Sequence, residues 1–248
     1  MSMDPGRFDR VVEDVRRYLR FLRDTGAPGV FTAPETAEII RKWNQSPRRT
    51  GGQRQAPISG RAHPEDGMAT LRAAFEKCRG CFPENAAPLA SVFGEGPPDA
   101  GVMFVGCFPE PADGRSRRPY SGEIGALLTK IIQAMRLERG SVYVCHAVKC
   151  LPPEGKAPSD DMVNACRHHL TGQIRAIRPK VICALGEIAA RSVPGIEAPI
   201  EQVRGAFHYY EGIAVMPTLD PADLLSDPAL KRMVWTDMQK VMKKLSHG

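Results

Sequence analysis

Seven cysteines are the residues of this sequence whose type and spacing best suit chemistry. Cys78 and Cys81 form a C-x-x-C pair, and Cys150 and Cys166 follow singly, with 15 residues between them. Four thiolates from these positions suit a tetrahedral zinc ion or a [4Fe–4S] cluster, and the spacing alone does not choose between the two. For Cys166 the alternative is burial on the apolar face of a helix, because free cysteine is among the most buried residue types.

The three other cysteines have different surroundings. Cys145 and Cys183 lie inside apolar segments, which predicts inert thiols in the core. Cys107 directly follows an apolar segment, where a thiol could be functional or simply small and buried. The N-terminus mixes charged residues with its apolar ones and lacks the pattern of a signal peptide, so we expect a cytoplasmic protein. An odd number of cysteines in that reducing compartment argues against a disulfide framework.

Alternating strands and helices must position these cysteines. The sequence predicts buried strands at 101–106, 142–150 and 180–186, helices at about 122–137, 160–177 and 228–245, and a hairpin over 207–217. The hairpin is expected to turn at Glu211-Gly212. This alternation predicts an α/β domain whose parallel sheet is covered by helices on both faces. Functional residues should then gather at the carboxyl ends of the strands, near 106–109, 145–150 and 217–220.

Residues 1–70 differ in composition from the rest of the chain. Apolar residues between Phe8 and Leu22 recur at steps of three and four, which predicts a helix that ends near Gly26. Between residues 41 and 72, seven basic residues against two acidic ones leave a local excess of +5, out of a net charge of +6. We interpret this Gly-, Pro- and Ser-rich stretch as a flexible linker that either straps onto a phosphate backbone or is simply solvated. The α/β domain is expected to span 71–248.

The overall composition is that of a globular protein. With 42% hydrophobic and 25% charged residues among 248, the chain is neither disordered nor fibrous. No run of about 18 apolar residues indicates a membrane span, and no P-loop or dinucleotide fingerprint is present. The length fits one domain with an appendage, and we expect a monomer without a membrane partner.

From Cys78 almost to Leu245 the sequence resembles the family 4 uracil-DNA glycosylases, the iron–sulfur enzymes of bacteria and archaea. The segments that carry the resemblance are the C-x-x-C at 78–81, VFGEGPPDAGVMFVG at 92–106, RPYSGEIGALL at 118–128, VYVCHAVKCLPP at 142–153, Cys166, QIRAIRPKVICALGEIAA at 173–190, VRG at 203–205 and DPADLL at 220–225. The resemblance implies a three-layer α/β/α fold around a central four-stranded parallel sheet. It also implies that the first four cysteines discussed above hold a structural [4Fe–4S] cluster.

Family chemistry hydrolyses the N-glycosidic bond of a uracil that has left the DNA stack, which implies DNA as partner and base excision repair as setting. This sequence departs from the family at the positions which that chemistry uses. Cys107 stands in place of the family's catalytic glutamate, and Glu110 in place of a glycine. Tyr120 stands at the aromatic stacking position, His146 at the asparagine that reads uracil, and Asp220 at the histidine that stabilises the departing base.

Three hypotheses follow from these departures. In the first, the protein hydrolyses the bond to uracil or another modified base: Phe108, Tyr120 and His146 bind the base, and Cys107, Glu110, His146 and Asp220 are the catalytic positions. Glu110 or Asp220 would orient the water, and His146 would stabilise the leaving base. In the second, the protein is a catalytically degenerate iron–sulfur protein that still binds DNA. In the third, it is a metal-stabilised scaffold whose N-terminal helix docks a protein partner.

A basic loop precedes Tyr120. Arg115, Arg117 and Arg118 lie close to the predicted base pocket, where the resembled family has an acidic loop. We predict that these arginines contact DNA phosphates, with a solvated basic loop as the alternative.

Overall fold

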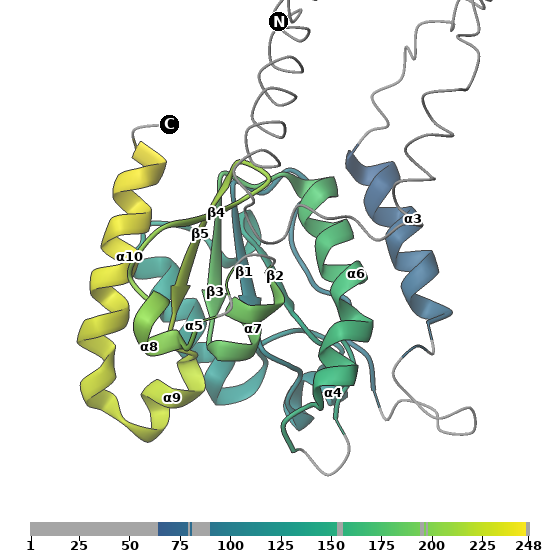
Figure 1. Cartoon of the computed structure of the whole chain (residues 1–248), viewed down its shortest axis with the longest axis horizontal. Coiled ribbons are helices and arrows are strands. Elements are labelled where there is room, and N and C mark those ends of the chain that lie inside the picture. The colour runs from purple at the N-terminus through teal and green to yellow at the C-terminus, as the bar shows by residue number, and fades with distance from the viewer. Residues whose placement is uncertain are drawn as a thin grey trace, which may run out of the picture. The chain divides into compact units, whose positions relative to one another are not determined.

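Figure 1 shows the computed structural model of the chain, which describes residues 64–78, 80, 90–152, 156–193, 196 and 198–246. The predicted N-terminal helix, the basic linker as far as residue 63, and Cys81 lie outside the described residues. The domain boundary near residue 70 stays a prediction.

A five-stranded sheet with the order β2-β1-β3-β5-β4 forms the centre of the domain. The strands are β1 (Val102–Gly106), β2 (Tyr143–His146), β3 (Val181–Leu185), β4 (His208–Tyr210) and β5 (Ile213–Thr218). The first four in spatial order run parallel, as the predicted sheet requires. β4 pairs antiparallel with β5, so the predicted count of four strands is wrong by one edge strand. The predicted hairpin supplies that strand, and it turns where Glu211 and Gly212 have φ values of 48° and 81°.

Helices cover both faces of the sheet (Figure 1). The longer ones are α5 (Gly122–Ala134), α6 (Asp160–Ile177) and α10 (Lys231–Ser246), and the shorter ones are α4 (Pro111–Ser116), α7 (Glu187–Ser192), α8 (Ile200–Val203), α9 (Pro221–Ser226), η1 (Arg139–Ser141) and η3 (Pro228–Leu230). Met103 and Val105 pack in the core shared with α6, α7 and α8. Phe104 packs on the other side, with α5, α9 and α10. Because successive strand residues point to opposite faces, this alternation produces the three layers predicted from the sequence.

Helix α3 (Pro64–Glu76) corrects the sequence interpretation of the linker, which was predicted to stay flexible through residue 70. The helix packs against α6, where small residues allow close approach. A Cβ added to Gly172 of α6 would meet the Leu71 side chain at 2.9 Å, and one added to Gly67 would meet the Cβ of Ala176 at 3.8 Å. Residues 64–70, which were predicted to belong to the flexible linker, are therefore helical. None of the helices in the described part of the chain is long and apolar enough to cross a membrane.

Candidate active site

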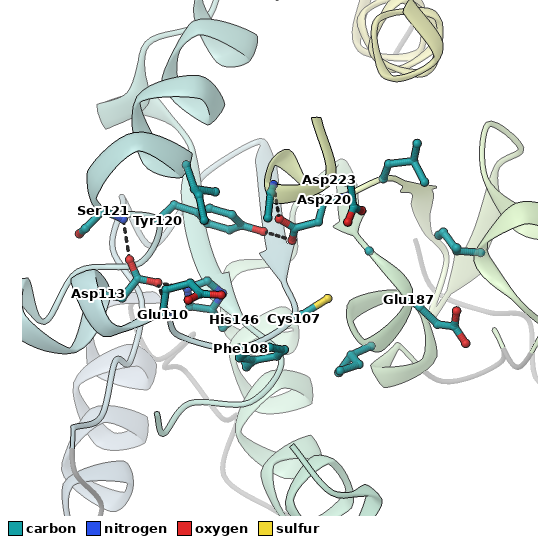
Figure 2. Close-up of a pocket in the computed structure, with 16 residues that line it drawn as sticks. Cys107, Phe108, Glu110, Asp113, Tyr120, Ser121, His146, Glu187, Asp220 and Asp223 are labelled. Atoms are coloured by element: carbon teal, nitrogen blue, oxygen red, sulfur yellow. Dashed lines mark hydrogen bonds and ion pairs between the residues drawn. The ribbon is translucent and has the colours of Figure 1, made fainter. Parts of the chain in front are cut away.

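A cavity of about 390 Å³ opens where the parallel strands end, the edge of the sheet predicted to carry function (Figure 2). Cys107 directly follows β1, His146 is the last residue of β2, and Asp220 lies between β5 and α9. Phe108, Glu110 and Tyr120 complete the predicted set, and all six line this one cavity. The structure thus brings together every base-binding and catalytic candidate named from the sequence. Its other lining residues are Asp113, Ser121, Ile124, Gly186, Glu187, Ile188, Ile200, Leu219, Ala222 and Asp223.

Two short helices with matching first turns place carboxylates in the cavity wall. Glu110-Pro111-Ala112-Asp113 opens α4, and Asp220-Pro221-Ala222-Asp223 opens α9. In each, proline occupies the start of the helix and the aspartate at its third position accepts a hydrogen bond from the N–H of the residue before the helix, at 3.1 Å in α4 and 3.2 Å in α9. This capping arrangement fixes both turns and the acidic groups they carry.

Tyr120 crosses the cavity and connects its two sides (Figure 2). Its hydroxyl donates to Oδ2 of Asp220 at 2.7 Å, and its ring lies with its centroid 4.8 Å from that of His146. Its backbone adopts φ 51°, a left-handed conformation that is unfavourable for a bulky residue. Gly106 and Gly125 make this position available, because a Cβ on Gly106 would overlap the Tyr120 hydroxyl and one on Gly125 would overlap its carbonyl oxygen. Strained backbone of this kind is concentrated at functional sites.

Asp113 and His146 form a buried pair at the wall of the cavity, and each side chain is only 2% exposed. Oδ2 of Asp113 lies 3.0 Å from Nε2 of His146, and Oδ1 accepts the N–H of Ser121 at 2.6 Å. Asp113 was not among the residues predicted for the site. Its position three residues after Glu110, at the start of a helix that begins with a proline, is the sequence signal for it.

The protonation of this pair follows from its surroundings. Burial lowers the pKa of His146, and Asp113 offsets this only in part, so the ring is neutral at pH 7. Burial alone would raise the pKa of Asp113, but hydrogen bonds from His146, Ser121 and Glu110 outweigh it and lower the pKa. An ionised Asp113 can only accept, so His146 donates through Nε2–H and its Nδ1 is an acceptor. That Nδ1 is buried and has no hydrogen-bond partner among the described residues.

Cys107 is a neutral thiol in this setting. Its Sγ donates to the carbonyl oxygen of Leu185 at 3.3 Å. Burial, reinforced by the negative charge of Asp220, raises the pKa of Cys107 to about 12. Gly186, with φ 84°, makes room for the sulfur, since a Cβ there would lie 2.7 Å from Sγ. The thiol therefore does not replace a family carboxylate as a base or a charge.

Asp220 and Glu110 are cavity carboxyl groups whose pKa values are raised. Asp220 accepts from the N–H of Ala222 at 2.9 Å as well as from Tyr120. Burial raises the pKa of Asp220 to about 6, although these two hydrogen bonds oppose the shift. Burial and then Asp113 raise the pKa of Glu110. Asp220 is therefore mainly ionised at neutral pH.

The three arginines predicted to contact DNA lie outside the cavity lining. Arg115 and Arg117 are exposed at the end of α4. Arg118, 67% exposed, pairs with Glu95 at 2.7 Å, and Glu95 also pairs with Arg139 at 3.0 Å. Arg118 and Arg139 border a second hollow of about 360 Å³ beside Tyr120 and Ser121. The loop thus presents positive charge next to the cavity mouth.

The predicted cluster cysteines come from three parts of the fold. Cys78 follows α3, Cys150 follows β2, and Cys166 lies on α6, the helix that α3 packs against; Cys81 is outside the described residues. In the described part of the chain, the Cys78 sulfur and one ring nitrogen each of His168 and His169 lie within 4.8 Å of one another. This Cys/His group is a different set from the predicted four.

Lys149 is a buried basic residue in the segment that carries the predicted cluster ligand Cys150. The residue precedes Cys150 and is fully buried. Its ammonium contacts the amide oxygen of Gln173 and the thiol of Cys145, both neutral partners. A buried cation is costly without nearby negative charge, and neither of these partners supplies it. The four predicted cysteines are a donor set that suits a [4Fe–4S] cluster.

Comparison with known proteins places the chain in a family. Residues 93–239 match the model of the uracil DNA glycosylase superfamily. The type-4 uracil-DNA glycosylase of Thermotoga maritima is 36% identical over 180 residues, which cover 71% of this chain and 93% of that protein. The type-4 enzyme of Saccharolobus solfataricus is 33% identical over 194 residues, 73% of this chain and 88% of that one. A solved structure, Pedobacter heparinus SMUG2, matches 60% of this chain and 77% of its own at 13% identity with a TM-score of 0.39.

The α/β/α architecture with its cavity at the carboxyl edge of the sheet, and the matches in sequence, define the class. The chain belongs to the uracil-DNA glycosylase superfamily, and the two relatives compared in sequence are type-4 enzymes. The resemblance carried by the sequence motifs is thereby confirmed. At the family level, this membership supports DNA glycosylase activity on a DNA substrate.

Proposed function

We propose that this protein is a DNA repair glycosylase that hydrolyses the N-glycosidic bond of a modified base flipped into the cavity described above. The observation that supports this most directly is the cavity itself, whose wall holds two aromatic rings, a buried histidine and the carboxyl groups of Glu110 and Asp220 within one opening of about 390 Å³. This volume lies within the range of about 300–1,000 Å³ that is common for small-molecule sites.

The proposed reaction breaks the bond between C1′ of the sugar and the base nitrogen. The electron pair leaves with the base, and positive charge develops on the sugar. Asp220, held by Tyr120 and the N–H of Ala222, stabilises that charge electrostatically. Glu110 orients the attacking water and accepts its proton as the water adds to C1′.

His146 takes a different role from the one expected from the sequence. Stabilising an anionic leaving base requires an N–H, and in this tautomer the only one is donated to Asp113. The unpartnered Nδ1 suits recognition of an N–H on the edge of the base. We therefore propose that His146 reads the base and that Tyr120 and Phe108 supply the flat surfaces that hold it.

Release of the free base from DNA tests this proposal. DNA duplexes that each contain one modified base, including uracil, hypoxanthine and N-methylated bases, are incubated with the protein, and the released base is quantified by mass spectrometry. Glu110→Gln should lower the release rate by about 10²–10⁴-fold, the usual contribution of a positioned base. Asp161→Asn, on the exposed first turn of α6, is the control for a change of charge. Retained DNA binding without release of any base would favour the non-catalytic alternative.

We further propose that Cys78, Cys81, Cys150 and Cys166 hold a [4Fe–4S] cluster. The cluster supplies a structural cross-link between α3, α6 and the segment after β2, and no residue of the reaction depends on its chemistry. The purified protein should contain iron and acid-labile sulfide, and its broad visible absorption should bleach on reduction. Cys166→Ser should lose iron, whereas Cys183→Ala, inside β3, should retain it. A colourless protein with stoichiometric zinc would contradict the assignment.

A further inference from the structure

The cavity is acidic although the chain is basic. Five of its lining residues carry carboxyl groups, and among the described lining residues none is a lysine or an arginine. The carboxyl groups belong to Glu110, Asp113, Glu187, Asp220 and Asp223. Figure 2 shows Asp220 at the hydroxyl end of Tyr120, and Glu187 farther away and pointing away from Tyr120. A chain with a net charge of +6 thus presents concentrated negative charge at the position where a base would enter.

The side-chain donors in the cavity wall are already engaged within the protein. The Tyr120 hydroxyl donates to Asp220, the Cys107 thiol to the carbonyl of Leu185, and the Ser121 hydroxyl to the carbonyl of Arg118 at 3.0 Å. Nε2–H of His146 is given to Asp113. The buried Nδ1 of His146 is left as an acceptor without a partner among the described residues. The side chains of the described wall therefore offer acceptors and negative charge to a ligand.

Uracil fits this wall poorly. Its pairing edge presents two carbonyl oxygens and one N–H, so a site for uracil needs side-chain or backbone donors for two acceptors. No side-chain donor of the described wall is free for these two oxygens, and carboxylates that face them cannot donate to them. The departing uracil is moreover an anion, which the charge of Asp220 repels.

We propose that the cavity selects a flipped base that is cationic, namely an N-alkylated base such as 3-methylcytosine or 1-methyladenine. This inference rests on the proposed function and names its substrate class. A cationic ring is attracted by the carboxylates and by the faces of Tyr120 and Phe108, and its remaining N–H groups meet acceptors.

The same assignment explains how the bond can break without a group that stabilises an anion. When C1′–N cleaves, the cationic base takes the electron pair and leaves as a neutral molecule. The sugar cation then adds water, and one proton is released to Glu110 and on to solvent. The overall change is a cationic nucleotide plus water giving an abasic sugar, a neutral base and a proton. A carboxylate near the sugar attracts the cationic base before cleavage and stabilises the positive charge that develops on the sugar. Asp220 is therefore suited to this step.

Two methylated bases of nearly identical shape provide the test. 3-Methylcytosine is cationic and 3-methyluracil is neutral, and neither can form a normal pair in a duplex. We expect the full-length protein to bind duplex DNA carrying 3-methylcytosine about tenfold more tightly than DNA carrying 3-methyluracil, a ratio that corresponds to about 1.4 kcal/mol. Equal affinities, or tighter binding of 3-methyluracil, would overturn the proposal.

The charge of Asp220 should account for much of this ratio. Asp220→Asn is expected to reduce the preference to about threefold or less, whereas the remote Asp161→Asn should preserve it. If Asp220→Asn does not fold, Glu110→Gln tests the same point from α4. An undiminished preference in both cavity variants would contradict the assignment of selectivity to these carboxylates.

Base release separates this inference from the proposed function. Release of 3-methylcytosine in preference to 3-methyluracil and uracil supports both. Preferential binding of the cation without any base release supports the binding preference and overturns the proposed hydrolysis. Release of uracil with no preference between the methylated pair overturns the cationic substrate and leaves the hydrolysis standing.

Discussion

Among single residues, Asp113 joins three parts of the cavity wall. It accepts hydrogen bonds from the N–H groups of Ser121 and Glu110 and from the ring of His146. It thereby holds both ends of the loop that contains α4 and fixes the tautomer of the histidine. The acceptor that His146 offers to a base is therefore a consequence of where Asp113 lies.

Asp113→Ala should destabilise the fold by about 3 kcal/mol, because buried donors lose a charged acceptor. Urea unfolding of the variant and the wild type measures this difference. Asp161→Ala, on an exposed turn, is the matched control. A loss below about 1 kcal/mol would mean that water or another group satisfies these donors.

Asp220 should make stability depend on pH. Because its pKa is raised to about 6, the folded state takes up this proton at a higher pH than the unfolded state, whose aspartate has a pKa of about 3.9. Its buried charge therefore costs stability above pH 6, and that cost is relieved as the pH falls from 6 toward 4. Asp220→Asn should be more stable than the wild type at pH 8 and lose that advantage near pH 4. Unfolding free energies at both pH values test this, and a constant difference would contradict the raised pKa.

Among the elements, the β4–β5 hairpin depends on its turn. Gly212 has φ 81° in open surroundings, so Gly212→Ala meets no neighbour but must adopt an unfavourable backbone conformation. We expect a loss of about 1 kcal/mol in unfolding free energy. Gly101→Ala, also in open space but without a positive φ, should be neutral or slightly stabilising. Equal effects of the two substitutions would contradict the assignment of strain to Gly212.

The main elements could be predicted because their signals are local. Strands β1 and β3 are short apolar runs, α6 and α10 have apolar residues at helical spacing, and Glu211-Gly212 is a typical hairpin turn. The alternation of strand and helix predicted a parallel sheet, and the family resemblance implied its four strands. The fifth strand could have been counted too, since the predicted hairpin contained it.

Helix α3 and Asp113 were missed for different physical reasons. Met68, Leu71 and Phe75 do recur at helical spacing, but Pro64 and the adjacent glycine-rich stretch favoured a linker, and the helix is stabilised by packing on α6. Asp113 acts through His146, which is 33 residues away in the sequence. Only the folded structure brings that pair together, whereas the predicted cavity residues followed from strand ends or, as for Tyr120, from the family resemblance.

At the scale of the whole molecule, the cavity is lined by acidic residues, whereas most of the net positive charge comes from residues 41–72 of the sequence. If the basic segment outside the described residues contacts phosphates, replacing Arg48, Arg49 and Arg54 together by Gln in the full chain should weaken DNA binding. The slope of log affinity against log salt should fall by about 0.9 for each phosphate of duplex DNA that the variant no longer neutralises. Affinity measured at several salt concentrations gives that slope.

A matched variant separates this effect from net charge. Replacing Lys231, Arg232 and Lys243 of α10 by Gln removes the same charge from a surface elsewhere. An equal fall in slope for both variants would show a general effect of charge. It would favour the interpretation of the basic segment as a solvated linker.

The small apolar cluster around Cys166 has a consequence for motion. Val148, Met162 and Val163 pack with Cys166, and the cavity residues Phe108 and Ile188 pack against them. Residues that share one packed cluster tend to open as a cooperative unit, with a single free energy of opening. Hydrogen exchange should therefore give the amides of 107–108 and 162–166 similar protection. Loss of the proposed iron–sulfur cluster would then speed hydrogen exchange at the cavity wall as well as around the cysteines. The stability of the cavity wall would thus depend on whether the cluster is bound.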